Sequence, residues 1–291
     1  MKSKIIMGII IAILVVAVAV EGVIIFNHSK EDRKVETPIE QPKENVEDTP
    51  SAKPVVTQTP KPAQEIKGER LTITKKYNEP KDDELVYAYI DARIIENEDK
   101  NKTEYKYRIP QINIDSSDVQ AINDEIIIKF TNRYDEMIEQ QVLYELVEYK
   151  YFVNGDILSL IIIYDNWMSA QYFSSDIYNI NISTGKQVNS NELLKYLNIT
   201  EEEFREKLIN VIKNSPDYKE PYDEEATTKK CDETIKMYEE MPINEMQLYI
   251  STDGNIAAYI YVNAVAGGEF SYYLMQLETG ELDWDGVDVT V

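Results

Sequence analysis

An unbroken apolar run near the N-terminus constrains this chain more than any other feature of its sequence. Residues 5–20 read IIMGIIIAILVVAVAV, and after Glu21 the run resumes as GVIIF and ends at Phe26. The span 5–26 has 22 residues, and an α-helix needs about 20 apolar residues to cross the hydrocarbon core of a bilayer. We therefore expect a transmembrane signal anchor over residues 5–26.

The charges beside this run predict its orientation. Lys2 and Lys4 precede it, and positive residues stay on the cytoplasmic side. We expect residues 1–4 to be cytoplasmic and the C-terminal part of this single-pass protein of the cell membrane to be extracellular. A cleaved signal peptide is the alternative, because residues 17–19 form an A-x-A site. The apolar character continues past that site to Phe26, which favours the uncleaved anchor.

A polar stalk is expected to follow the anchor. Residues 28–66 contain no aromatic residue and are rich in Pro, Lys, Glu and Thr. Such a segment cannot bury enough apolar area to offset its ordering entropy, and its proline content makes it a semi-stiff spacer. We predict a disordered stalk over residues 27–66 and a folded extracytoplasmic domain over residues 67–291.

The charge balance restricts the partners of this domain. The chain has 30 Lys and Arg residues against 53 Asp and Glu residues, a formal net charge of −23. Nucleic-acid binding needs clustered cations that displace counterions from phosphates, so this class of function is excluded. An acidic surface attracts cationic partners over long distances. We expect either a cationic protein or a cell-wall glycan as the partner.

The scarcity of histidine and cysteine excludes much enzymology. His28 is the only histidine, and it lies beside the apolar run. A Ser-His-Asp or Cys-His mechanism therefore has no histidine in the folded part. Cys231 is the only cysteine, which excludes an internal disulfide and cysteine-based zinc or iron–sulfur clusters. We expect Cys231 to be a half-buried inert thiol, and we assign no catalytic, cofactor-binding or metal-ligating residue.

Hydrophobic periodicity predicts an α+β domain built from antiparallel hairpins, one long packed helix and short helices. The long helix begins at a capping box of Ser117 and Gln120, and an apolar stripe of Val119, Ile122, Ile126, Phe130, Tyr134 and Met137 follows it. Further helices are predicted from the pairs Asn189 and Glu192, Thr200 and Glu203, and from a weak stripe of Cys231, Ile235 and Tyr238.

Alternating β-rich runs predict the strands. The Asn154-Gly155 pair between two such runs predicts a hairpin with a type I′ turn, and Asp253-Gly254 predicts a second hairpin. The expected strands cover residues 71–77, 85–95, 104–114, 142–153, 156–164, 172–182, 245–251, 256–262, 270–277 and 282–284.

Two segments resemble a catalytic motif and a metal-binding motif, but they are better interpreted as a turn and an acidic tail. Ser183-Thr184-Gly185-Lys186 matches the S-x-x-K motif of penicillin-recognising enzymes, but it follows a strand and has an internal glycine, which is typical of a turn. Asp283, Asp285 and Asp288 resemble part of a calcium loop without its spacing. A hydrolase with two carboxylates stays open as the alternative function, because 53 acidic residues do not single out a pair.

Gly267-Gly268-Glu269-Phe270 is the candidate partner-binding segment. A glycine pair between two strands is either a plain bend or a place where a partner approaches the backbone. The chain also has 21 Tyr against 6 Phe, and tyrosine is enriched both in binding faces and in strands.

Three ordered stretches resemble a known family. They are Ile109-Pro110-Gln111-Ile112 leading into the helix Val119–Ile126, then Tyr178–Lys186 followed by Glu192-Leu193-Leu194, and then Leu248–Asn255 followed by Gly267–Phe270. In this order they are similar to the RsiV-like/PdaC-like extracytoplasmic domain of Gram-positive bacteria, which is largely a domain of unknown function. The resemblance covers about residues 105–280.

The resemblance implies an α+β fold and an outer binding domain. RsiV-like members are anti-sigma factors whose outer domain binds lysozyme, and PdaC-like members carry a separate peptidoglycan deacetylase domain. We expect neither the sigma-binding region nor the deacetylase here, because four residues precede the apolar run and the sequence ends at Val291. The expected function is a non-enzymatic membrane-anchored binding or sensing module.

Overall fold

The computed structural model describes residues 63–98, 101–143, 145–166, 173–219, 223–251, 253–265 and 270–284. The chain divides into two units, Met1–Thr57 and Gln58–Val291, and all described residues belong to the second. The expected anchor over 5–26 and the stalk up to residue 62 lie outside the described residues. Across the described ranges, no helix combines the length and apolar character needed to cross a membrane.

The described strands form three antiparallel sheets of four strands each. Sheet A consists of β1 (Gln64–Lys67), β2 (Leu71–Tyr77), β3 (Val86–Glu98) and β4 (Asn101–Ile112), in that order. Sheet B consists of β5 (Glu145–Asn154), β6 (Ile157–Asn166), β7 (Phe173–Asn181) and β8 (Lys186–Gln187). Sheet C has the order β12-β11-β10-β9, with β9 (Gln247–Ile250), β10 (Ile256–Asn263), β11 (Phe270–Gln276) and β12 (Leu282–Trp284).

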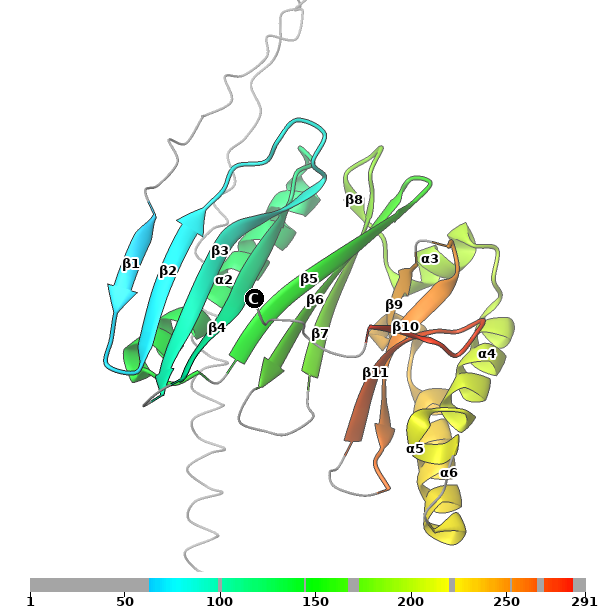
Figure 1. Cartoon of the computed structure of the whole chain (residues 1–291). Coiled ribbons are helices and arrows are strands. Elements are labelled where there is room, and N and C mark those ends of the chain that lie inside the picture. The colour runs from blue at the N-terminus through cyan, green and yellow to red at the C-terminus, as the bar shows by residue number, and fades with distance from the viewer. Residues whose placement is uncertain are drawn as a thin grey trace, which may run out of the picture. The chain divides into compact units, whose positions relative to one another are not determined.

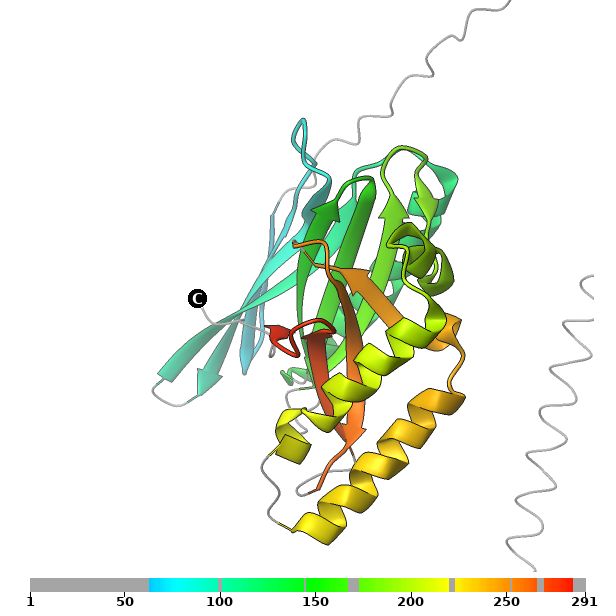
Figure 2. The same ribbon diagram turned by 90° about the vertical axis from the view of Figure 1, so that its right-hand side faces the viewer.

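Helices cover the outer faces of this arrangement. The described helices are α2 (Ser117–Gln140), α3 (Ser190–Tyr196), α4 (Glu201–Lys213), α5 (Pro216–Lys219), α6 (Glu224–Glu240) and the 3₁₀ helix η1 (Ile243–Glu245). Figure 1 shows sheet B between sheet A and sheet C, with α2 behind sheet A. Figure 2 shows α4 and α6 side by side in front of sheet C. The folded unit is therefore layered, with helices on both outer sides.

The α2 helix forms the first core because its apolar stripe faces the sheets. All six residues of the expected stripe are buried, and they pack against inward-facing side chains of sheets A and B. Asn123 fixes the register of the helix, because its side chain accepts a hydrogen bond from the Ile112 nitrogen and donates one to the Ile112 oxygen, both at 2.9 Å. One side chain thus satisfies both backbone groups at the end of β4.

Strand β6 of sheet B is buried on both faces because its alternate residues point to different cores. Leu158, Leu160 and Ile162 pack in the α2 core, whereas Ile161 and Ile163 pack against Tyr249 and Leu274 of sheet C. Such continuous apolar character is typical of a strand that is covered on both sides.

Two polar side chains also join sheet B to sheet C. Ser159 donates to Asn179 Oδ1 at 2.7 Å and accepts from the Ile250 nitrogen at 3.1 Å. Asn179 donates to the Leu248 oxygen at 2.7 Å. These bonds fix β9 against sheet B.

The structure confirms the α+β class with antiparallel hairpins. Both capping boxes are present, at Asn189 with Glu192 and at Thr200 with Glu203. The expected cap of the long helix is wrong by one residue, because Ser116 is the residue whose side chain accepts from the Val119 nitrogen.

The first hairpin turn also differs from the expectation. Asn154 pairs with Ile157 as the last rung of the ladder, so Gly155 and Asp156 are the central residues of the turn. Gly155 has φ of +54°, and Asp156 does not have a positive φ. A positive φ at the first central residue alone is typical of a type II′ turn, not of the expected type I′.

The sequence pattern does not predict strand β1. This strand begins at Gln64, three residues before the expected start of the domain. Only Ile66 among its four residues is partly buried. A short and polar edge strand therefore gave no hydrophobic pattern to recognise.

Candidate functional site

The structure describes only one residue of the candidate partner-binding segment, Phe270. Gly267, Gly268 and Glu269 lie outside the described residues. Phe270 is the first residue of β11 and pairs with Asn263, the last residue of β10. Its ring is half-buried and contacts the Tyr261 ring edge-on, with centroids 5.3 Å apart.

Phe270 belongs to an aromatic face, which we define as Tyr259, Tyr261, Phe270 and Tyr272. Tyr261 lies directly opposite Tyr272 in the β10–β11 ladder. The other two residues follow at steps of two along the strands, so the four side chains share one side of sheet C. All four are half-buried. Tyr259 stacks on Tyr272 at 6.0 Å, and Tyr261 and Phe270 lie 6.2 Å and 6.5 Å from Tyr272.

Neighbouring elements hold the aromatic face in place. The Tyr259 hydroxyl donates to the Phe173 oxygen of β7 at 2.9 Å, and the two rings lie 6.0 Å apart. Burial raises the pKa of Tyr259, so this phenol stays a neutral donor. The Tyr261 nitrogen donates to the Tyr238 hydroxyl of α6 at 2.9 Å. Beyond Tyr259, β10 pairs with β11 but no longer with β9, which leaves its end less covered.

The two expected hairpin tips meet each other but do not meet Phe270. A Cβ added at Gly254 would lie 2.8 Å from Asn154 Nδ2, so the turns after β5 and after β9 are in contact. They lie at the Ile256 end of β10, whereas Phe270 lies at its Asn263 end. Eight residues at about 3.3 Å each separate these ends. The two hairpin turns therefore lie far from the Phe270 end of β10.

The negative charge is concentrated in the part of the chain that carries the aromatic face. Residues 113–291 contain 12 Lys and Arg residues against 34 Asp and Glu residues, a net charge of −22. Residues 63–112, which form sheet A, contain 10 against 11. The excess of acidic residues therefore lies outside sheet A, in the part of the chain that forms α2, sheet B, sheet C and its helices.

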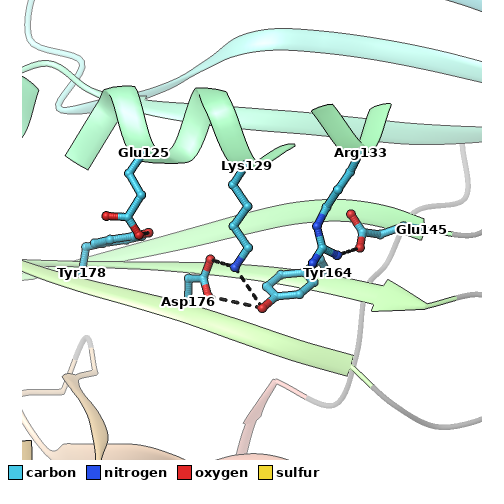
Figure 3. Close-up of polar contacts among 7 residues, drawn as sticks. All are labelled: Glu125, Lys129, Arg133, Glu145, Tyr164, Asp176 and Tyr178. Atoms are coloured by element: carbon cyan, nitrogen blue, oxygen red, sulfur yellow. Dashed lines mark hydrogen bonds and ion pairs between the residues drawn. The ribbon is translucent and has the colours of Figure 1, made fainter. Parts of the chain in front are cut away.

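A cluster of charged residues lies between α2 and sheet B. It is relevant to the alternative function, a hydrolase that uses two carboxylates. Figure 3 shows Lys129 of α2 bound to Asp176 of β7, with both groups hydrogen-bonded to the Tyr164 hydroxyl at 3.0 Å and 3.3 Å. One turn further along α2, Arg133 pairs with Glu145. Each of these two carboxylates is thus neutralised by its own cation.

The pKa shifts in this cluster describe structural ion pairs. Burial alone lowers the pKa of Lys129, but its bonds to Asp176 and Tyr164 raise the pKa above its usual value. Burial raises the pKa of Glu145, and Arg133 only partly offsets this shift. Because Lys129 and Arg133 also lie over the Tyr164 ring at 4.3 Å and 5.1 Å, the cations are held rigidly. This arrangement joins α2 to sheet B, with Asp176 and Glu145 each paired with a cation of α2.

The remaining sequence motifs have structural positions. Ser183 lies in the turn between β7 and β8, Lys186 is the first residue of β8, and the Ser183 hydroxyl donates to Asp156 at 2.9 Å. Cys231 is a half-buried free thiol whose pKa is raised by burial. Asp283 lies in β12, and Asp285 and Asp288 lie outside the described residues. In the part of the chain that the structure describes, no three His, Cys, Asp or Glu side chains are grouped to hold a metal ion.

The sequence matches neither a protein-family model nor a curated protein.

The sequence pattern predicts Phe270 as a binding residue but does not indicate its three tyrosine neighbours in the aromatic face. The period-two spacing of Tyr259 and Tyr261, and of Phe270 and Tyr272, was readable from the sequence. Their meeting depends on the register between β10 and β11, which the spacing within each strand does not give.

Proposed function

We propose that this chain is a membrane-anchored extracytoplasmic binding module whose aromatic face binds a cationic protein. The observation that carries the proposal is the aromatic face itself, four contacting and half-exposed rings in the acidic part of the domain. Specific interfaces need a desolvated centre of aromatic anchors, and opposite charge increases the rate of encounter. The resemblance to the RsiV-like/PdaC-like domain makes lysozyme the first candidate partner.

Rings that are held before binding lose little entropy on association. The Tyr259 hydroxyl is hydrogen-bonded to β7, and the Tyr261 ring contacts the Tyr238 ring of α6 with centroids 5.8 Å apart. Immobilising a free side chain at an interface costs about 0.5–1.5 kcal/mol. Preorganisation of the aromatic face therefore favours a binding role for it.

Lysozyme binding by the full chain in detergent micelles tests this proposal. We expect binding to persist at about 0.15 M salt, where charges further apart than about 8 Å are screened. Tyr261→Ala and Phe270→Ala should each weaken it at least about tenfold, since aromatic hot spots contribute about 2 kcal/mol or more. Affinity is measured by biolayer interferometry over a salt series, and circular dichroism checks that each variant is folded.

Tyr196→Ala is the matched control for this experiment. Tyr196 is 42% exposed and lies on α3, away from the aromatic face. We expect its affinity to equal that of the unchanged protein. Loss of all binding at about 0.15 M salt would mean that charge attraction alone acts. An equal loss with Tyr196→Ala would also contradict the proposed interface.

A topology experiment tests the anchored location. The expected anchor over 5–26 predicts that protease added to intact, wall-stripped cells releases a fragment that begins shortly before β1 at Gln64. Mass spectrometry of the released fragment gives its first residue. A chain that stays whole until the cells are lysed would show that the domain is not outside the membrane.

A further inference from the structure

A cavity of about 440 Å³ lies where strands β2 to β5 meet the loop between β2 and β3. None of these elements contributes to the aromatic face. Its volume is in the lower part of the range for small-molecule sites, about 300–1,000 Å³. Three phenol rings and three cations line it: Tyr77, Tyr87, Tyr149, Lys76, Lys81 and Arg108.

The cavity has a fixed polar group on one side. Arg108 Nε and Nη2 lie 2.8 Å and 2.6 Å from the two oxygens of Glu148 on β5. The same guanidinium lies 5.3 Å from the centre of the Tyr149 ring. A two-point Arg–carboxylate pair is geometrically well defined, and its stacking on Tyr149 holds the ring as well. This side of the cavity is therefore preorganised.

The charges around the cavity nearly balance. The lining contains Lys76, Lys81 and Arg108 together with Glu79 and Glu84, and Glu148 neutralises Arg108. A site for an anion or a cation would carry an excess of the opposite charge. The balance favours an uncharged ligand that both donates and accepts hydrogen bonds.

The tyrosines supply the matching neutral groups. Burial raises the pKa of Tyr87 and of Tyr149 to about 12, so both phenols stay protonated. A neutral phenol has an aromatic body and a hydroxyl that can donate and accept. The Tyr87 hydroxyl is hydrogen-bonded to Gln111 Oε1 at 2.6 Å, so this ring too is held in one orientation.

We propose that this cavity binds a neutral pyranose saccharide. A pyranose ring has a flat C–H face, which suits the tyrosine rings, and a rim of hydroxyls, which suits lysine donors beside carboxylate acceptors. The inference stands apart from the binding of a cationic protein, because the cavity lies on strands of sheets A and B and shares no residue with the aromatic face.

The test uses the full chain in detergent micelles, with chitotetraose and cellotetraose as probes. Saturation-transfer NMR and calorimetry measure binding. We expect a Kd of about 1 mM or lower for at least one probe, as is usual for a small exposed site. Tyr149→Ala should weaken binding at least about tenfold, and Lys81→Ala, at an exposed rim position, about threefold. Lys81→Ala keeps the test decisive if Tyr149→Ala is unfolded.

Tyr151→Ala is the matched control, because Tyr151 lies two residues away on the same strand, is 41% exposed and does not line the cavity. It should bind as the unchanged protein does. Tyr261→Ala should also bind the saccharide normally, so that failure of the aromatic face and failure of this site are distinguished. Absence of binding of both probes at about 10 mM, or equal losses with Tyr151→Ala and Tyr149→Ala, would overturn the inference.

Discussion

Phe130→Ala is expected to lower the free energy of unfolding by about 4 kcal/mol. The Phe130 side chain is fully buried at the middle of α2, within the core shared by sheets A and B. Its ring meets the Tyr164 ring edge-on at 5.3 Å, and its backbone oxygen accepts a hydrogen bond from Tyr107 at 3.0 Å. Alanine keeps the backbone bond but leaves a cavity the size of the ring.

The measurement is urea unfolding of residues 58–291, which form a compact unit, followed by circular dichroism. Ile128→Ala is the control on the same helix, since Ile128 is 62% exposed. Its expected effect is within about 0.5 kcal/mol, as for most surface substitutions. Similar losses for the two variants would show that α2 does not pack with its apolar stripe inward.

The long helix and the hairpins could be predicted because their information is local. The stripe from Val119 to Met137 repeats at helical spacing, and all of its members are buried. The turns at Gly155 and Gly254 have the positive φ that their sequences require. In these places propensity, periodicity and glycine turn chemistry agree on which element forms, although the helix cap lies one residue earlier than expected and the first turn is of a different type.

The sequence predicts helix α6 only from a weak apolar stripe, because polar groups stabilise the buried side of this helix. Thr234 is fully buried and forms a hydrogen bond with the Tyr218 hydroxyl at 2.8 Å. It also accepts hydrogen bonds from the nitrogen and the side chain of Asn263 at 3.0 Å and 3.1 Å. A threonine at a core position breaks the apolar stripe, and its partners on α5 and β10 cannot be read from the helix sequence.

The candidate site was predictable only in part for a similar reason. The glycines before Phe270 predict a site at the first residue of β11, where the aromatic face lies, although the glycines themselves are outside the described residues. The aromatic face exists because Tyr261 pairs with Tyr272 rather than with a neighbour one step away. A slip of one residue would turn one set of rings to the opposite side of the sheet.

Ion pairs between residues that are far apart in the sequence cannot be predicted from local sequence patterns either. Glu145 is 4% exposed, yet nothing near it in the sequence distinguishes it from the other acidic residues. Its partner, Arg133, comes from α2, and one Glu145 oxygen has no hydrogen-bond partner among the described residues. A buried carboxylate with a single cation depends strongly on that cation.

Arg133→Met is therefore expected to lower the free energy of unfolding by about 3 kcal/mol at pH 7. Methionine keeps much of the apolar stem but leaves Glu145 charged and buried. Arg93→Met is the control, because its pair with Glu104 at 3.1 Å is exposed on sheet A, and such pairs contribute about 0–1 kcal/mol. Urea unfolding of residues 58–291 at several pH values measures both variants.

The pH dependence distinguishes a stranded charge from lost packing. Burial raises the pKa of Glu145 in the folded protein above its unfolded value, although Arg133 opposes the shift. A carboxyl with a raised folded pKa stabilises the fold at low pH, and this contribution is lost as the pH rises through the folded pKa. Removing Arg133 raises that pKa further, so Arg133→Met should recover stability relative to the unchanged protein as the pH falls from 7 to 5.

Adding Glu145→Gln to Arg133→Met should restore most of the stability lost at pH 7 and remove the recovery at lower pH, because no buried charge is left. A deficit that stays constant with pH and persists in the double variant would mean that Arg133 stabilises α2 by packing and not by neutralising Glu145.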